Sequence, residues 1–205
     1  MQTPSPPTDE TPVFTGREAE FVRGAYDALA EVGARELSLR VLAKRLGVSP
    51  GLLVYYFKSK DGLFLEAMRY ALLEVVERIR ARLEDIDDPE EALVALVDAL
   101  FDDPQSSRDF YLVYLDLVGH SVRDPSFGGL ADLLWKYVNG SYAVVIQHGV
   151  VAGVFGIEDI ELAARQCRAL VEGSFLQWLQ SEDWEREHAR VRDDCLLALS
   201  ALLKA

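Results

Sequence analysis

Apolar side chains recur every three or four residues along most of this chain. That spacing places them on one face of an α-helix, whereas a half-buried strand would alternate apolar and polar positions. The pattern predicts an all-α protein of about nine helices, near residues 16–32, 38–46, 49–57, 59–83, 88–101, 107–122, 128–152, 159–180 and 183–203.

The expected helix ends carry residues that suit them. Six helices are predicted to begin at a serine or aspartate whose side chain can accept a hydrogen bond from a first-turn N–H: Ser38, Ser49, Ser59, Asp88, Asp159 and Asp183. Pro50 occupies a first helical position, where its missing N–H costs nothing. Gly33 and Gly47 stand where the first two helices are expected to end.

The stretch from about Gly128 to Ala152 supports two interpretations. Its β-branched residues within Tyr142–Ile146 are typical of a strand. Its length and the helical spacing of its leucines are typical of a long buried helix. We favour the helix, with a break at Gly153 or Gly156.

The composition is that of a globular protein. The chain has 205 residues, of which 50% are hydrophobic and 27% charged, enough to bury a core without disulfides or a structural metal. Residues 1–14 hold four of the eight prolines and are expected to form a disordered tail. Cys167 and Cys195 lie among apolar neighbours and are expected to be buried, reduced thiols. No signal peptide and no apolar run near the ~20 residues of a membrane span is present, so we expect a cytoplasmic protein with no membrane partner.

The charge is unevenly distributed along the chain. The formal net charge is −13, and a uniformly acidic protein would not be expected to bind nucleic acid. Residues 38–60, however, contain five basic residues and no acidic one. A basic segment next to an acidic remainder indicates a small polyanion-binding region.

The same segment has the spacing of a helix-turn-helix. Ala43 is small where a second helix must approach closely, and Gly47 lies in the turn, where a side chain would be strained. A helical hairpin that only packs would share this spacing. The absence of acidic residues and the adjacent Tyr55 and Tyr56 favour DNA binding, with the second helix in the major groove.

The residues in this region read Leu39-Arg40-x-x-Ala43-x-x-x-Gly47-Val48-Ser49-x-Gly51-x-Leu53-x-Tyr55-Tyr56-Phe57-Lys58-Ser59-Lys60-Asp61-x-Leu63. This run resembles the N-terminal domain of TetR-family transcriptional regulators. The resemblance implies a three-helix DNA-binding domain at residues 15–69 and a helical ligand-binding and dimerisation domain at residues 70–205. Leu52 and Val54 depart from many members, which carry hydroxyl groups there, and are closer to the subgroup of the repressor of choline–betaine genes.

The resemblance also assigns roles by position. The DNA-binding residues that it implies are Ser38, Arg40, Ser49, Pro50, Gly51, Leu52, Tyr55, Tyr56, Lys58 and Lys60. The residues at 49–52 would face the groove, where Leu52 suits a thymine methyl group. Tyr55, Tyr56 and Lys60 would contact phosphates. Lys44 and Arg45 are either further phosphate contacts or solvated cations.

The remaining sequence carries no signature of catalysis. The three histidines, His120, His148 and His188, are far apart and lack the spacing of metal ligands. No phosphate-binding loop or nucleophile motif occurs. We therefore expect no enzyme activity, no cofactor and no metal. The alternative function is a helical ligand carrier or enzyme whose basic segment contacts something other than DNA.

The C-terminal region is expected to bind a ligand and to dimerise. Its aromatic side chains are dense, and those selected as candidates to line a cavity are Phe110, Tyr114, Trp135, Tyr142 and Trp178. Helices 159–180 and 183–203 are apolar on more than one face, which predicts a two-fold homodimer. The sequence thus predicts a repressor that a small, largely apolar ligand of unknown identity releases from palindromic double-stranded DNA.

Overall fold

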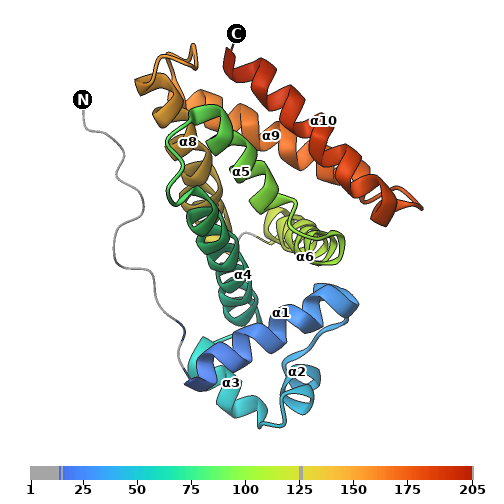
Figure 1. The fold of residues 1–205 in the computed structure, drawn as a ribbon. Helices are drawn as coiled ribbons and strands as arrows, with labels where there is room; N and C mark the ends of the chain where they lie inside the picture. Colours follow the sequence, from blue (N-terminus) through green and yellow to red (C-terminus); the bar gives the residue numbers. More distant parts are fainter. Residues whose placement is uncertain (1–13, 15, 125–126, 205) are drawn as a thin grey trace. The chain divides into compact units, whose positions relative to one another are not determined.

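The computed structural model describes residue 14, residues 16–124 and residues 127–204 (Figure 1). These residues form nine uninterrupted helical stretches and no strand. The tail expected at residues 1–14 falls, apart from Phe14, outside the described residues. The helices are α1 (Gly16–Glu36), α2 (Leu39–Arg45), α3 (Pro50–Phe57), α4 (Lys60–Leu83), α5 (Pro89–Leu100), α6 (Pro104–Arg123), α7 (Leu130–Leu134), the π-helix η1 (Trp135–Asn139), α8 (Gly140–Val151), α9 (Ile160–Trp178) and α10 (Trp184–Lys204).

The all-α prediction is confirmed, with two boundaries moved. Helix α1 does not end at Gly33 but continues to Glu36, and Gly33 forms a kink inside it with φ of 78° and ψ of 161°. α6 begins at Pro104 rather than at Ser107, because the Asp103 carboxylate accepts the Ser106 N–H at 2.9 Å and proline fits the first helical position. Hydrogen bonding to Ser106 also lowers the pKa of the Asp103 carboxyl. The sequence pattern missed this cap because the first turn of α6 is polar.

The ambiguous stretch is helical, and the strand interpretation is wrong. α7, η1 and α8 follow one another without a gap, and Gly153 turns the chain just beyond α8 with φ of 72°. The buried positions explain the π-helix. Tyr137 and Tyr142 are both about 3% exposed but lie five residues apart, one more than an α-helical stripe allows. A wider π turn absorbs the extra residue and keeps both halves of the stripe buried.

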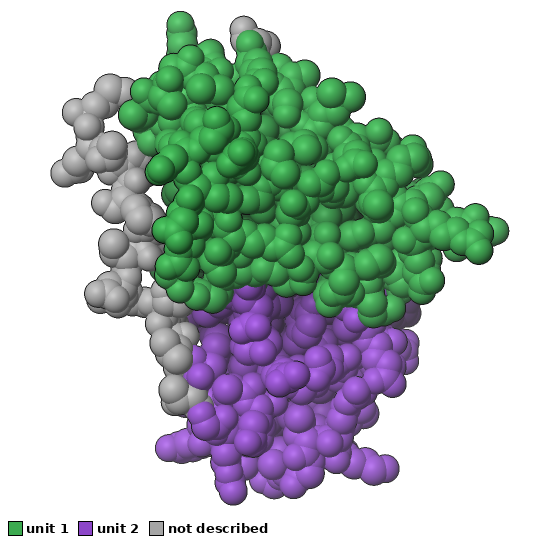
Figure 2. Space-filling model, in the orientation of Figure 1, with its two compact units in different colours: residues 1–9, 75–108, 134–205 green, residues 10–74, 109–133 purple. Residues whose placement is uncertain are grey.

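The described chain is organised as two compact units (Figure 2). We call residues 10–74 with 109–133 the head unit, and residues 75–108 with 134–205 the body unit. Helices α4 and α6 therefore contribute residues to both. The boundary expected at residue 69 stays a prediction. In the described ranges, every helix falls short of the length or hydropathy that crossing a bilayer requires.

The core of the head unit brings α1 close to the helix-turn-helix. Leu42 and Leu53, one from each of its helices, are fully buried. The contact with α1 is close: a Cβ at Gly24 would lie 2.4 Å from a methyl group of Leu46, whose side chain would have to shift. Gly47, in the turn, has φ of 69°, which favours glycine. The sequence therefore fixes the angle at which α3 leaves α2.

The body unit packs α5, α8, α9 and α10 around an aromatic cluster. The Phe101 and Phe175 rings stack at 4.1 Å, and the buried Trp178 donates its indole N–H to the Trp184 carbonyl at 2.6 Å. His188 is buried here, its Nε2 is 3.2 Å from the Ser107 hydroxyl, and burial lowers its pKa.

The prediction for the two cysteines is confirmed. Cys167 and Cys195 are both free and buried in the body unit. Burial raises the pKa of the Cys167 thiol to about 12 and that of Cys195 to about 11. Neither is therefore a nucleophile or a ready metal ligand at neutral pH.

Candidate DNA-binding surface and effector groove

Helix α3 begins at an exposed, well-capped end. The Ser49 hydroxyl accepts the Leu52 N–H at 3.3 Å, and Pro50 occupies the first helical position. Leu53 and Phe57 are buried and anchor the helix, whereas Ser49, Pro50 and Gly51 are exposed and Leu52 is half-buried. The exposed first turn offers backbone N–H groups and a small, mostly uncharged surface, as an element entering a DNA groove must.

The two tyrosines of α3 differ in how firmly they are held. Tyr56 lies edge-on against the Phe21 ring at 5.5 Å and is 38% exposed. Tyr55 is 72% exposed and contacts the Tyr56 ring. Lys58 ends the helix with φ of 67°, and its ammonium donates to the Tyr55 carbonyl at 3.1 Å. The end of α3 thus presents two phenol groups and one ammonium to solvent.

Helix α2 contributes cations. The Ser38 hydroxyl accepts the Val41 N–H at 3.3 Å, as expected for a cap. Arg40 and Lys44 are exposed and form no ion pair with any described residue. Arg45 instead pairs with Glu31 at 2.6 Å, which partly neutralises it. Of the two uncertain cations, Lys44 is therefore the better placed to meet a polyanion.

Lys60 is held differently from the other cations. Its ammonium is half-buried, donates to the Leu37 carbonyl at 3.3 Å and the Ala34 carbonyl at 3.4 Å, and lies over the Phe64 ring. These carbonyls flank the end of α1, where unpaired acceptors and the helix dipole attract a cation. Sequence reasoning could not see this contact because it spans more than twenty residues.

The body unit contains a groove of about 930 Å³ beside the π-helix. Its wall is formed by η1, α8, the start of α9 and the segment before it, with apolar contributions from Trp135, Val150 and Ile157. Three carboxylates, Glu158, Asp159 and Glu161, and one cation, Lys136, also line it, so the lining carries net negative charge. Trp135 is 45% exposed, and the Arg165 guanidinium lies 5.8 Å from its ring centroid.

One buried polar atom of a residue that lines this groove lacks a partner. Asn139 is 4% exposed, and its Oδ1 accepts the Arg168 Nη1 group at 3.0 Å. That bond fixes which amide atom is oxygen, so Nδ2 points elsewhere. Among the described residues Nδ2 has no hydrogen-bond partner. A buried, unsatisfied donor costs free energy, about 1–3 kcal/mol, which a ligand acceptor would recover. Asn139 was not among the sequence candidates.

The five aromatic candidates are distributed over the two units. Trp135 lines the groove, whereas Tyr142 and Trp178 are buried in the body core. Phe110 and Tyr114 belong to the head unit, where their rings stack at 6.5 Å. Aromatic density alone does not distinguish core from ligand wall.

Comparisons with known proteins agree with this arrangement. Residues 21–67 match the family model for bacterial regulatory proteins of the tetR family, and residues 89–203 match that for the BetI-type transcriptional repressor C-terminal domain. A relative is the HTH-type transcriptional regulator BetI of Stenotrophomonas maltophilia (strain R551-3). It is 29% identical over 166 residues, which cover 78% of this chain and 80% of that protein.

Solved structures of similar fold are also regulators. A TetR transcription regulator from Haloarcula marismortui ATCC 43049 has a TM-score of 0.73 and 26% identity, over 90% of this chain and 95% of its own. A transcriptional regulator from Saccharomonospora viridis, solved in complex with choline, has a TM-score of 0.71 and 28% identity, over 85% of this chain and 91% of its own. The chain accordingly belongs to the TetR family of transcriptional regulators, with a BetI-type C-terminal domain, and it is not an enzyme.

Proposed function

We propose that this regulator represses transcription as a homodimer on a pseudo-palindromic operator and that a small molecule releases it. The observation that carries the proposal is the surface of α2 and α3. A capped, exposed helix start lies beside Arg40 and Lys44, which no described carboxylate neutralises. Because bacterial DNA lies in the cytoplasm, we expect the protein to act there.

DNA binding is tested by selecting sequences from a random pool with the full-length protein, then titrating salt. Each phosphate that a cation neutralises contributes about −0.9 to the slope of log K against log salt. Lys44→Ala should weaken binding to all sequences alike and flatten the slope by about that amount. Lys136→Ala, in the body unit, is the matched control and should change neither. An unchanged slope in Lys44→Ala would remove this residue from the interface.

Dimerisation is supported by the outer faces of α9 and α10. Leu162 and Leu176 on α9 are 43% and 47% exposed, and Leu197 on α10 is 72% exposed. Exposed leucines along two packed helices favour a second copy that covers them. Leu197→Glu should shift the protein to monomer in analytical ultracentrifugation, whereas Val151→Glu, at a 77% exposed position on α8, should not. A wild-type monomer at micromolar concentration would overturn this part.

We propose that the effector binds the groove beside η1. The unpaired Asn139 amide calls for an acceptor, the apolar wall for an apolar body, and Glu158 and Glu161 for a cationic group. The expected ligand is thus more polar than the largely apolar molecule that the sequence predicts. Choline is the first probe, since it carries a quaternary ammonium and a hydroxyl oxygen and is bound by the Saccharomonospora viridis protein.

The effector site is tested by titrating choline, with binding followed by calorimetry and operator release measured on the same proteins. Trp135→Ala and Asn139→Ala should lose the response at unchanged operator affinity. Phe110, another of the sequence candidates, lies in the head unit, and Phe110→Ala should respond as wild type. A response lost in Phe110→Ala but kept in Trp135→Ala would move the site. No response to choline in wild type would exclude choline as the effector.

A further inference from the structure

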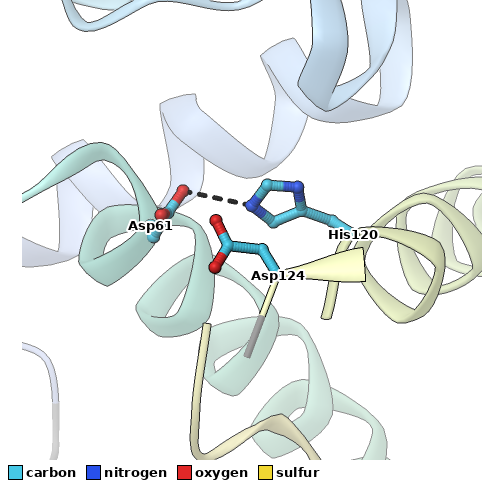
Figure 3. Close-up of side chains that lie close together, drawn as sticks. All are labelled: Asp61, His120 and Asp124. Atoms are coloured by element: carbon cyan, nitrogen blue, oxygen red, sulfur yellow. Dashed lines mark ion pairs between the residues drawn. The ribbon is translucent and has the colours of Figure 1, made fainter. Parts of the chain in front are cut away.

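The end of α6 presents polar side chains to the helices of the head unit at four-residue spacing. Asp116 accepts the Ala34 N–H at the end of α1. One turn later, His120 lies beside Asp61, in the first turn of α4, and Asp124 follows just past the end of α6. Asp61, His120 and Asp124 point toward one another (Figure 3). One ligand atom from each lies within 4.8 Å of the other two.

The His120 ring has a nitrogen that the protein does not satisfy. Its Nε2 is buried and, among the described residues, forms no hydrogen bond. Oδ1 of Asp61 lies 3.4 Å from it, within ion-pair distance (Figure 3) but beyond the usual 2.7–3.2 Å of an N–H···O bond. Ligand atoms about 2.0–2.2 Å from a tetrahedral zinc ion stand ~3.4 Å apart. The observed gap therefore has the length of one edge of a coordination sphere.

We propose that Asp61, His120 and Asp124 bind a divalent first-row transition-metal ion of the zinc type. An imidazole nitrogen favours Zn²⁺ over Mg²⁺ and Ca²⁺, which prefer all-oxygen sites with six or more ligands. Three protein ligands leave a position for water. The sequence predicted no metal because these residues lie on separate elements and lack any ligand motif.

The position of the site gives it a consequence for DNA binding. Asp61 follows the recognition helix α3 after a short turn, while His120 and Asp124 belong to the end of α6. A bound ion would fasten the start of α4 to α6 within the head unit and stabilise the fold of the DNA-binding helices. Binding of the ion stabilises the folded state by mass action.

The test is a titration of the full-length protein, freed of metal by a chelator, with ZnCl₂ by calorimetry and with CoCl₂ by absorption. We expect one ion per chain, a rise in Tm with zinc, and visible cobalt bands without sulfur charge transfer. His120→Gln and Asp124→Asn should each weaken binding at least tenfold. His148→Gln, on α8 outside the cluster, is the matched control and should bind as wild type. MgCl₂ should not compete.

Several results would overturn the site. They are no zinc uptake by the wild type up to ~100 µM, equal affinity in His120→Gln, or cobalt bands with sulfur charge transfer, which would place the ion at cysteine. If His120→Gln fails to fold by circular dichroism, Asp61→Asn replaces it as the deciding variant. Equal affinity in that variant also rejects the proposal.

Discussion

The candidate DNA-binding surface of the head unit and the groove of the body unit are assembled in different ways. The first lies within residues 38–60 and consists of two serine caps, a turn glycine and a run of cations. Each of these features depends only on residues close together in the sequence. The second is lined by residues between 135 and 164, and its distinguishing polar atom is set by a bond from Arg168 to Asn139. The first surface is therefore visible in sequence, while the second emerges only once the helices pack.

The largest effect is expected where the recognition helix is anchored. Leu53→Ala should lower the free energy of unfolding by about 2–5 kcal/mol, because the side chain is fully buried between the head helices. Val54→Ala, at the next position and 41% exposed, should change it by less than about 0.5 kcal/mol. Urea unfolding followed by circular dichroism measures both. Similar losses in the two variants would mean that α3 is not anchored through Leu53.

In the body unit the packing is tested by adding a Cβ atom at a glycine rather than by removing a side chain. A Cβ at Gly149 would lie 2.0 Å from the Phe155 ring, so Gly149→Ala should cost about 1–3 kcal/mol. At Gly140, also in α8, no atom lies within 4 Å of the added Cβ, and Gly140→Ala should stabilise the protein by up to about 1 kcal/mol. Thermal unfolding compares them. The same sign in both would contradict the tight turn after α8.

Lys60→Ala distinguishes a structural cation from a DNA contact. Losing the bonds to Ala34 and Leu37 should cost about 0.5–1.5 kcal/mol of unfolding free energy without DNA. If the lysine contacted only phosphate, as the sequence predicted, stability would be unchanged and the salt slope would fall by about one. Measuring both quantities on one preparation decides between the roles, and a variant showing both effects would assign both.

The smallest effect concerns pH. Burial lowers the pKa of His188 below its ordinary value of 6.5, so the unfolded chain binds this proton more readily than the folded chain. The stability that the neutral ring contributes is complete above pH 6.5 and is lost as pH falls from there toward the folded pKa. His188→Gln should flatten the pH dependence of unfolding just below pH 6.5. An identical profile would place the titrating group elsewhere.

Most of the fold could be predicted because its signals are local. The caps at Ser38, Ser49 and Asp159 and the left-handed Gly47 depend on side chains within a few residues of the backbone that they serve. The hydrogen bonds from Lys60 to the end of α1 and the contact of His120 with Asp61 depend on packing between segments that are distant in the sequence. The spacing of residues along one helix does not encode such contacts.

The groove was predictable only in part. Trp135 was among the candidates, but buried and groove-lining aromatics look alike in sequence, so Tyr142 and Trp178 were selected with it. Asn139 gave no signal at all, because its role depends on Arg168. The single clue available was the five-residue step between Tyr137 and Tyr142, which interrupts the helical spacing.

The five-residue step between Tyr137 and Tyr142 makes η1 equivalent to a one-residue insertion in a regular α-helix. Each residue turns an α-helix by 100°, so deleting one residue between Tyr137 and Tyr142 would restore the four-residue spacing and leave both halves of the buried stripe facing the core. The shortened helix would be regular, but the groove would lose the wall that η1 provides. A change of one codon is therefore expected to separate the proposed effector response from stability.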